Sequence, residues 1–166
     1  MFAISLIVIG ISMFLNGFLP IIDENDNNEV VVMNVISGVF TFIISIFGII
    51  NAQDTLTLIE YGTILLFSIT NLYIAGVNIW YLSESSLGWF SMVCFVISVA
   101  IGIFYLLNAN TMFAILYFVW ALVWLSYFVS RALNVLQKTS SYVIMLGGAI
   151  ALISLGLSLI SGILVF

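Results

Sequence analysis

The sequence has no histidine, one cysteine and only two basic residues, Arg131 and Lys138. Imidazole is the usual group for haem ligation, zinc ligation and proton relays near neutral pH, so its absence argues against all three. The lone Cys94 excludes a disulfide framework within the chain and a cysteine metal cage. We therefore expect no metal, no cofactor and no surface for nucleic acid.

Charged residues are also scarce, at 5% of the chain, whereas hydrophobic residues make up 64%. A water-soluble globule could not hide this much apolar surface, so lipid must be the solvent for most of it. Four of the seven acidic residues lie between Asp23 and Glu29, as expected of a solvated loop. The remaining length leaves no room for a catalytic domain, and we expect no enzyme.

Long apolar runs fill the rest of the sequence. A helix needs about 20 apolar residues to cross the hydrocarbon core of a bilayer, and polar separators divide the chain into six such stretches. A barrel would show strict alternation instead, so an all-helical membrane protein is predicted. It forms one domain over residues 1–166, with spans at 2–22, 30–50, 56–82, 87–107, 112–136 and 141–166.

Arg131 and Lys138 flank the fifth connection between these spans. The positive-inside rule places that connection in the cytoplasm. Because successive spans alternate in direction, the first, third and fifth loops are predicted to be cytoplasmic, with both termini outside.

The fifth span carries aromatic residues at spacings of three and four, which places them on one helix face. A slot between flat rings suits planar, uncharged solutes such as urea and acetamide. Aromatic residues also act as interface anchors or packing units, although Trp120 and Trp124 lie mid-span. The face comprises Phe113, Tyr117, Trp120, Trp124, Tyr127, Phe128 and Arg131.

Polar groups interrupt other spans. Asn16 ends a face that also holds Leu6, Ile9 and Met13, and its amide is suited to bind either a solute or another helix. Glu60 is a carboxylate within a span and a candidate titrating residue, unless it reaches water. The third span is expected to turn its polar residues to the bundle interior, namely Ser68, Thr70, Asn71, Tyr73 and Asn78.

The last span contains small residues four apart, Ser154, Ser158 and Gly162, together with Gly147 and Gly148. Small residues at this spacing allow close approach between helices. The pattern predicts helix packing or oligomer assembly and does not require transport.

Five segments together resemble the AmiS/UreI family of bacterial urea and amide channels. They are Ile9–Gly17 (IGISMFLNG), Val32–Gly38 (VMNVISG), Leu65–Asn78 (LLFSITNLYIAGVN), Leu87–Phe95 (LGWFSMVCF) and Trp120–Leu125 (WALVWL). The resemblance implies a six-helix protomer in a homohexameric ring, one channel per protomer and both termini outside. It also implies a channel wall of Leu6, Ile9, Met13, Asn16, Ile69, Tyr73, Trp120 and Trp124.

The chain departs from the family pattern in two respects. Acid-gated members carry histidines in their outer loops, and this sequence has none. Gly147 stands where the family tends to have a glutamate, so solute preference or assembly could differ. Because carboxylates have reference pKa values near 4, flux is expected to be nearly flat between about pH 5 and 7.5.

The sequence thus predicts a passive channel for urea or short-chain aliphatic amides in the bacterial inner membrane, functionally linked to a cytoplasmic urease or amidase. Urea and an aliphatic amide present the same planar carboxamide, so the choice between them stays open. One alternative is a proton-coupled transporter that uses Glu60. Another is a non-transporting membrane assembly subunit that uses the small residues of the last span.

Overall fold

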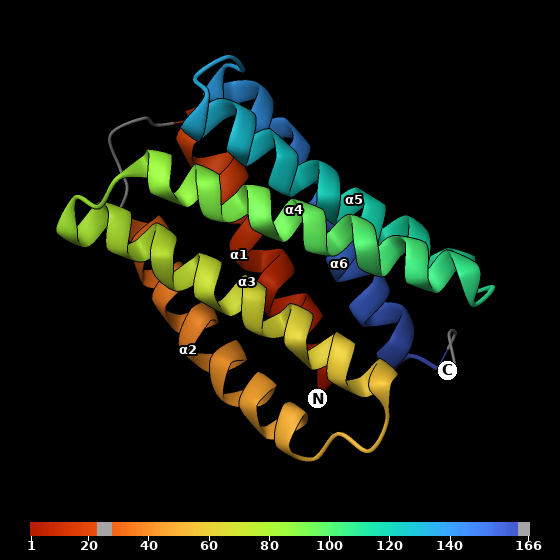
Figure 1. The fold of residues 1–166 in the computed structure, drawn as a ribbon. Helices are drawn as coiled ribbons and strands as arrows, with labels where there is room; N and C mark the ends of the chain where they lie inside the picture. Colours follow the sequence, from red (N-terminus) through yellow and green to blue (C-terminus); the bar gives the residue numbers. More distant parts are fainter. Residues whose placement is uncertain (23–27, 163–166) are drawn as a thin grey trace.

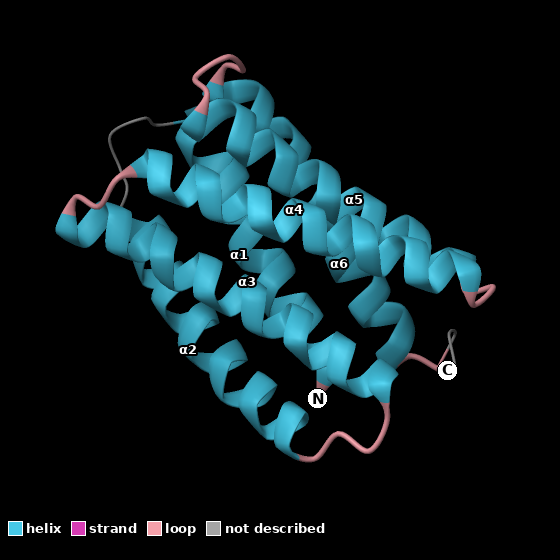
Figure 2. Cartoon of the chain, in the orientation of Figure 1, coloured by secondary structure: helices cyan, strands magenta, loops and turns pink. Residues whose placement is uncertain are grey.

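The structure, a computed structural model, describes residues 1–22 and 28–162. These residues form helices joined by short loops, and the described part of the chain contains no strand (Figure 2). The elements are α1 (Phe2–Ile22), α2 (Asn28–Ile50), α3 (Thr55–Trp80), α4 (Glu84–Leu107), α5 (Thr111–Tyr127), the π-helix η1 (Phe128–Ala132) and α6 (Lys138–Ile160).

Side chains in the loops define where several helices begin. Asp54 precedes α3 and accepts a 2.8 Å hydrogen bond from the Thr57 backbone N–H. Ser83 and Asn110 accept equivalent bonds at the starts of α4 and α5. These caps satisfy backbone donors that the first helical turn leaves unpaired.

The helices run alternately up and down the bundle (Figure 1). In that view α2 lies beside α3 and α4 beside α5, while α1 and α6 are neighbours behind them. α1, α3 and α5 end at one end of the bundle, and α1 begins at the other end, where α6 also finishes. Six segments, with η1 counted as part of the fifth, are long and apolar enough to cross a membrane.

Six spans were predicted and six are found, but some boundaries differ. Glu29 lies in α2 rather than in the preceding loop, whose residues 23–27 fall outside the described part. The fifth span was predicted to continue to residue 136, yet it ends in η1 at Ala132. Asn134 then adopts a positive φ of 55°, which stops the helix although apolar residues continue beyond it.

Glycines set the close contact between α1 and α6. A β-carbon added to Gly17 would lie 2.8 Å from the Tyr142 carbonyl oxygen, and one added to Gly156 would lie 2.8 Å from that of Ala3. Two residues of the predicted small-residue pattern, Gly147 and Ser154, make no such close contact, because both are exposed on the surface of the protomer. Those two residues therefore do not pack helices within the protomer.

Candidate functional site

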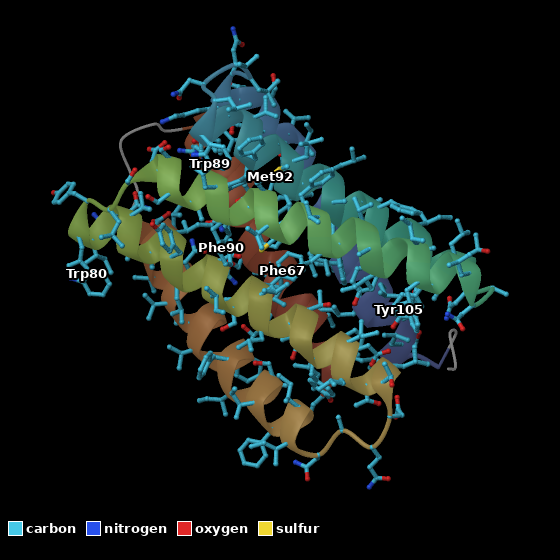
Figure 3. The ribbon with its side chains drawn as sticks, in the orientation of Figure 1. Phe67, Trp80, Trp89, Phe90, Met92 and Tyr105 are labelled. Carbon is cyan, nitrogen blue, oxygen red and sulfur yellow. The ribbon has the colours of Figure 1, made fainter. Side chains whose placement is uncertain are left out.

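The aromatic face of α5 is buried inside the bundle. Trp120 is fully buried and Trp124 is 3% exposed, and Phe67 on α3 packs against both, with ring centroids 5.3 and 5.0 Å away. Phe90 on α4 meets the Trp124 ring edge-on at 6.5 Å. Figure 3 shows Phe67 and Phe90 between α3 and α4, whereas Trp80 projects away from the bundle. We call this set of packed rings, formed by Phe67, Phe90, Trp120 and Trp124, the aromatic column.

The column continues toward the end of the bundle where α3 begins. Tyr105 on α4 stacks on Tyr117 at 5.4 Å, and Tyr117 lies 4.7 Å from Trp120. The Thr63 hydroxyl donates to the Ile59 carbonyl oxygen, so the Tyr117 hydroxyl donates to Thr63 over 2.9 Å. This hydrogen bond fixes one ring of the column to α3.

Two donors in the column have no partner. Trp120 Nε1 and Tyr105 Oη are buried and form no hydrogen bond with any described residue. An unpaired buried donor costs roughly 1–3 kcal/mol, so such groups are uncommon in protein interiors. Neither residue lines one of the cavities described below, but a carbonyl oxygen or a water molecule that reached either donor would satisfy it.

A cavity of about 310 Å³ opens at the other end of the bundle, where α3 ends and α4 begins. We call it the charged vestibule. Its lining comprises Asn16, Pro20, Val30, Ile74, Val77, Asn78, Glu84, Leu87, Tyr127, Arg131, Lys138, Thr139 and Tyr142.

An ion-pair cluster forms one wall of the charged vestibule. Glu84 at the start of α4 binds Arg131 of η1 at 2.6 Å and Lys138 of α6 at 2.9 Å. Arg131 also donates to the Tyr142 hydroxyl at 2.9 Å and lies 5.7 Å from the centre of the Tyr127 ring. The cluster joins three helical elements at the mouth of the vestibule.

A second, much smaller cavity lies between the charged vestibule and the aromatic column. This "deep cavity" measures about 20 Å³, which is room for roughly one water molecule. Asn16, Ile74 and Tyr127 line both cavities, and we call these three residues the neck. Beyond the deep cavity the rings are packed together, so a solute would have to displace side chains to pass.

The structure brings most of the predicted wall residues together. Leu6, Ile9, Met13 and Asn16 are buried along one face of α1, and Met13 and Asn16 line the deep cavity with Trp124. Tyr73 is half-buried against the core. Ile69, by contrast, is 37% exposed. Neither cavity is lined by Leu6, Ile9, Ile69, Tyr73 or Trp120, so their place in a channel wall stays a prediction.

The polar residues of the third span largely face the interior, as expected. Ser68, Thr70 and Asn71 are buried, while Tyr73 and Asn78 are half-buried. Glu60 is half-buried on the same helix and forms no ion pair with a described residue.

Sequence patterns missed two residues of the site. Phe67 was not singled out, because a phenylalanine in an apolar span carries no signal of its own. Asn34 on α2 is fully buried and bonds Asn16, but it lies on a different helix, and its sequence neighbours do not show that the two residues meet. A polar residue within a span is the signal that could have identified it.

These features define a multi-pass membrane protein with a vestibule at one end, a small cavity beyond it and a packed column of rings in its interior. A family model described as AmiS/UreI family transporter matches residues 1–163, and the chain belongs to this family. The predicted resemblance is confirmed, and the protein is a transporter rather than an enzyme. Membership in a transporter family also argues against a non-transporting assembly subunit.

Two solved structures are similar to this fold. One is the crystal structure of the urea channel from the human gastric pathogen Helicobacter pylori, and the other is the cryoEM structure of the Helicobacter pylori urea channel in its closed state. Each has a TM-score of 0.83 and 22% sequence identity, and each match covers 98% of this chain and 99% of the other. At this identity the likeness shows a shared fold. No curated relative matches the sequence.

Proposed function

We propose that this protein is a passive channel for urea or short-chain aliphatic amides across the bacterial inner membrane. The observation that carries the proposal is the aromatic column, which has unpaired donors at Trp120 Nε1 and Tyr105 Oη and borders the deep cavity at Trp124. Ring faces match a planar solute, and the donors replace hydrogen bonds that its carbonyl oxygen made to water. The rings of the column are uncharged and offer an ion no ion pair.

The solute path under this proposal runs from the outer end of α3 to the charged vestibule. Trp120, Trp124 and Tyr73 stack on the solute, and Asn16 guides it by hydrogen bonding. The positive charges of Arg131 and Lys138 favour a cytoplasmic position for the vestibule, and under that orientation both termini lie outside. A cytoplasmic urease or amidase would then consume the delivered solute, and a homohexamer would carry one channel in each protomer.

The test is stopped-flow measurement of urea and acetamide permeability in proteoliposomes. Wild type should exceed protein-free liposomes for at least one solute, and Trp124→Ala should admit bulkier amides relatively better because it removes a ring from the wall. Trp80→Ala makes the same deletion at a side chain that is 70% exposed, and it should behave as wild type. Wild-type permeability equal to that of empty liposomes for both solutes would refute the proposal.

A second candidate is proton-coupled transport through Glu60. It is favoured by the position of this carboxylate, which is half-buried within α3 and has no ion-pair partner among the described residues. Coupled transport predicts uptake that responds to an imposed pH gradient and loses that response in Glu60→Gln. If uptake is unchanged by the pH gradient and by Glu60→Gln, this candidate is excluded.

A further inference from the structure

Asn34 lies on α2 outside both cavities, yet it contacts the neck. Its side chain is fully buried, and its amide pairs reciprocally with that of Asn16. Asn34 Nδ2 donates to Asn16 Oδ1 over 2.6 Å, and Asn16 Nδ2 donates to Asn34 Oδ1 over 3.0 Å. A neck residue is therefore bound by a residue that no solute touches.

The direction of this amide pair is set by the backbone of α2. Asn34 Nδ2 donates its other hydrogen to the Val30 carbonyl oxygen over 2.7 Å. A carbonyl oxygen accepts only from a donor, so the nitrogen end of the Asn34 amide must face Val30. The second N–H of Asn34 then requires the oxygen of Asn16, and the orientation of the Asn16 amide follows.

Two further side chains hold the pair in place. The Ser12 hydroxyl lies 3.4 Å from Asn34 Oδ1 and 3.3 Å from Asn71 Oδ1, and its single hydrogen is shared between these two acceptors. Asn71 in turn donates to the Ser37 hydroxyl over 2.9 Å. The network links α1, α2 and α3, and all its side chains are buried.

Asn16 keeps one hydrogen-bond donor for a solute. Its amide has two N–H groups, and Asn34 takes one of them. Among the described residues Asn34 is the one acceptor bonded to Asn16 Nδ2, and Asn16 lines both cavities, so we take the second N–H to be the donor that the neck offers. When the Asn16 amide is fixed in this orientation, it offers an N–H donor at the neck. If the amide could rotate by half a turn, it would offer its oxygen as an acceptor about as often as its N–H as a donor.

We propose that Asn34 is a positioning residue that fixes the Asn16 amide, so that the neck presents an N–H donor to the carbonyl oxygen of an amide solute. This inference rests on the proposed channel function and specifies how one of its groups selects solutes. Selection acts on the acceptor atom: a carbonyl oxygen accepts this hydrogen bond well, and the larger thiocarbonyl sulfur accepts it poorly.

The probe is the ratio of urea to thiourea permeability in proteoliposomes. Asn34→Ala should lower this ratio by about twofold to tenfold, the range expected from one hydrogen bond. Asn34→Leu keeps the side-chain bulk without the amide, and it should lower the ratio similarly. Thr41→Val is the matched control: Thr41 is fully buried on α2 but donates to the Ser37 carbonyl of its own helix, so the ratio should stay at the wild-type value.

A double substitution separates positioning from general packing. Asn16→Ala should lower the ratio on its own, and adding Asn34→Ala should change it no further, because Asn34 acts through Asn16. A wild-type ratio in both Asn34 variants would overturn the inference, as would a further drop in the double variant. Either result leaves the channel function intact, whereas a wild type that conducts no urea removes the channel function and the inference together.

Discussion

Glu84→Gln tests the ion-pair cluster at the charged vestibule. The substitution keeps the shape of the side chain but removes the charge that faces both Arg131 and Lys138. The two contacts differ in burial, because the Arg131 side chain is 12% exposed and that of Lys138 is 51% exposed, with Glu84 at 40%. The loss of stability should therefore come mainly from Arg131.

The size of the expected loss of stability follows from this difference in burial. A pair between exposed side chains contributes about 0–1 kcal/mol, which bounds the Lys138 contact. Removing one partner of a fully buried pair costs about 3–5 kcal/mol, because the other charge stays buried alone. Water reaches Glu84, and the Tyr142 hydroxyl still binds Arg131. We therefore expect Glu84→Gln to lower the free energy of unfolding by about 2–3 kcal/mol.

The assay is SDS titration of the purified protein in mixed micelles. Lys138→Gln should cost less than about 1 kcal/mol, and its effect should fade in roughly 1 M salt, where the screening length is about 3 Å. Glu84→Gln combined with Arg131→Met should be more stable than Glu84→Gln alone, since no unpaired buried charge remains. Equal losses in Glu84→Gln and Lys138→Gln, or a double variant weaker than Glu84→Gln, would refute the reasoning.

Three further predictions concern single positions. Gly88→Ala should destabilise the protein by about 1–3 kcal/mol in the same titration, because the added carbon would meet the Ala132 backbone nitrogen at 2.6 Å. Gly62→Ala, which meets nothing within 4 Å, should be neutral or stabilising, and a loss there equal to that of Gly88→Ala would contradict the packing argument. Any step in urea flux between about pH 5 and 7.5 should vanish in Glu60→Gln, because the chain has no histidine; a step that survives would exclude Glu60 as its source. Hydrogen bonds from Thr57 hold the pKa of Asp54 below its usual value, so this carboxylate stabilises the folded protein above about pH 3.9 and its contribution is lost as the pH falls through the lowered pKa. Asp54→Ala should thus lower thermal stability at pH 7 and converge with wild type in strong acid, and a gap that persists there would be the contrary result.

The fold was readily predicted because membrane spans depend on length and polarity, which a sequence shows directly. The boundaries were less accurate where local geometry ended a helix. Residues 133–136 include three apolar residues, so the fifth span was extended through them, but the chain leaves the helix after η1. A π-helix and a left-handed Asn134 depend on packing around that turn and leave no hydropathy signal.

The site was predicted only in part, because a sequence shows spacing along one helix but not which helices lie side by side. Spacing along one helix placed Trp120 and Trp124 on one face, and both are buried in the column. Partnerships between helices were not visible, since Asn16 and Asn34 are separated by a loop and Arg131 lies 47 positions from Glu84. Ile69 came from the family resemblance alone, and because its side chain is partly exposed, its place in a channel wall stays a prediction.

The small size of the deep cavity bears on how a solute would pass. A space of about 20 Å³ holds one water molecule, so urea cannot rest there without movement of the surrounding side chains. Trp120 is enclosed by Phe67 and Tyr117, whereas Trp124 borders the deep cavity on one side. Under the proposed function a solute in the deep cavity would therefore meet the Trp124 ring first and would have to displace it. A slot opened between flat rings would admit a planar amide more easily than a branched solute of equal volume, so the tight packing of the column would itself favour flat solutes.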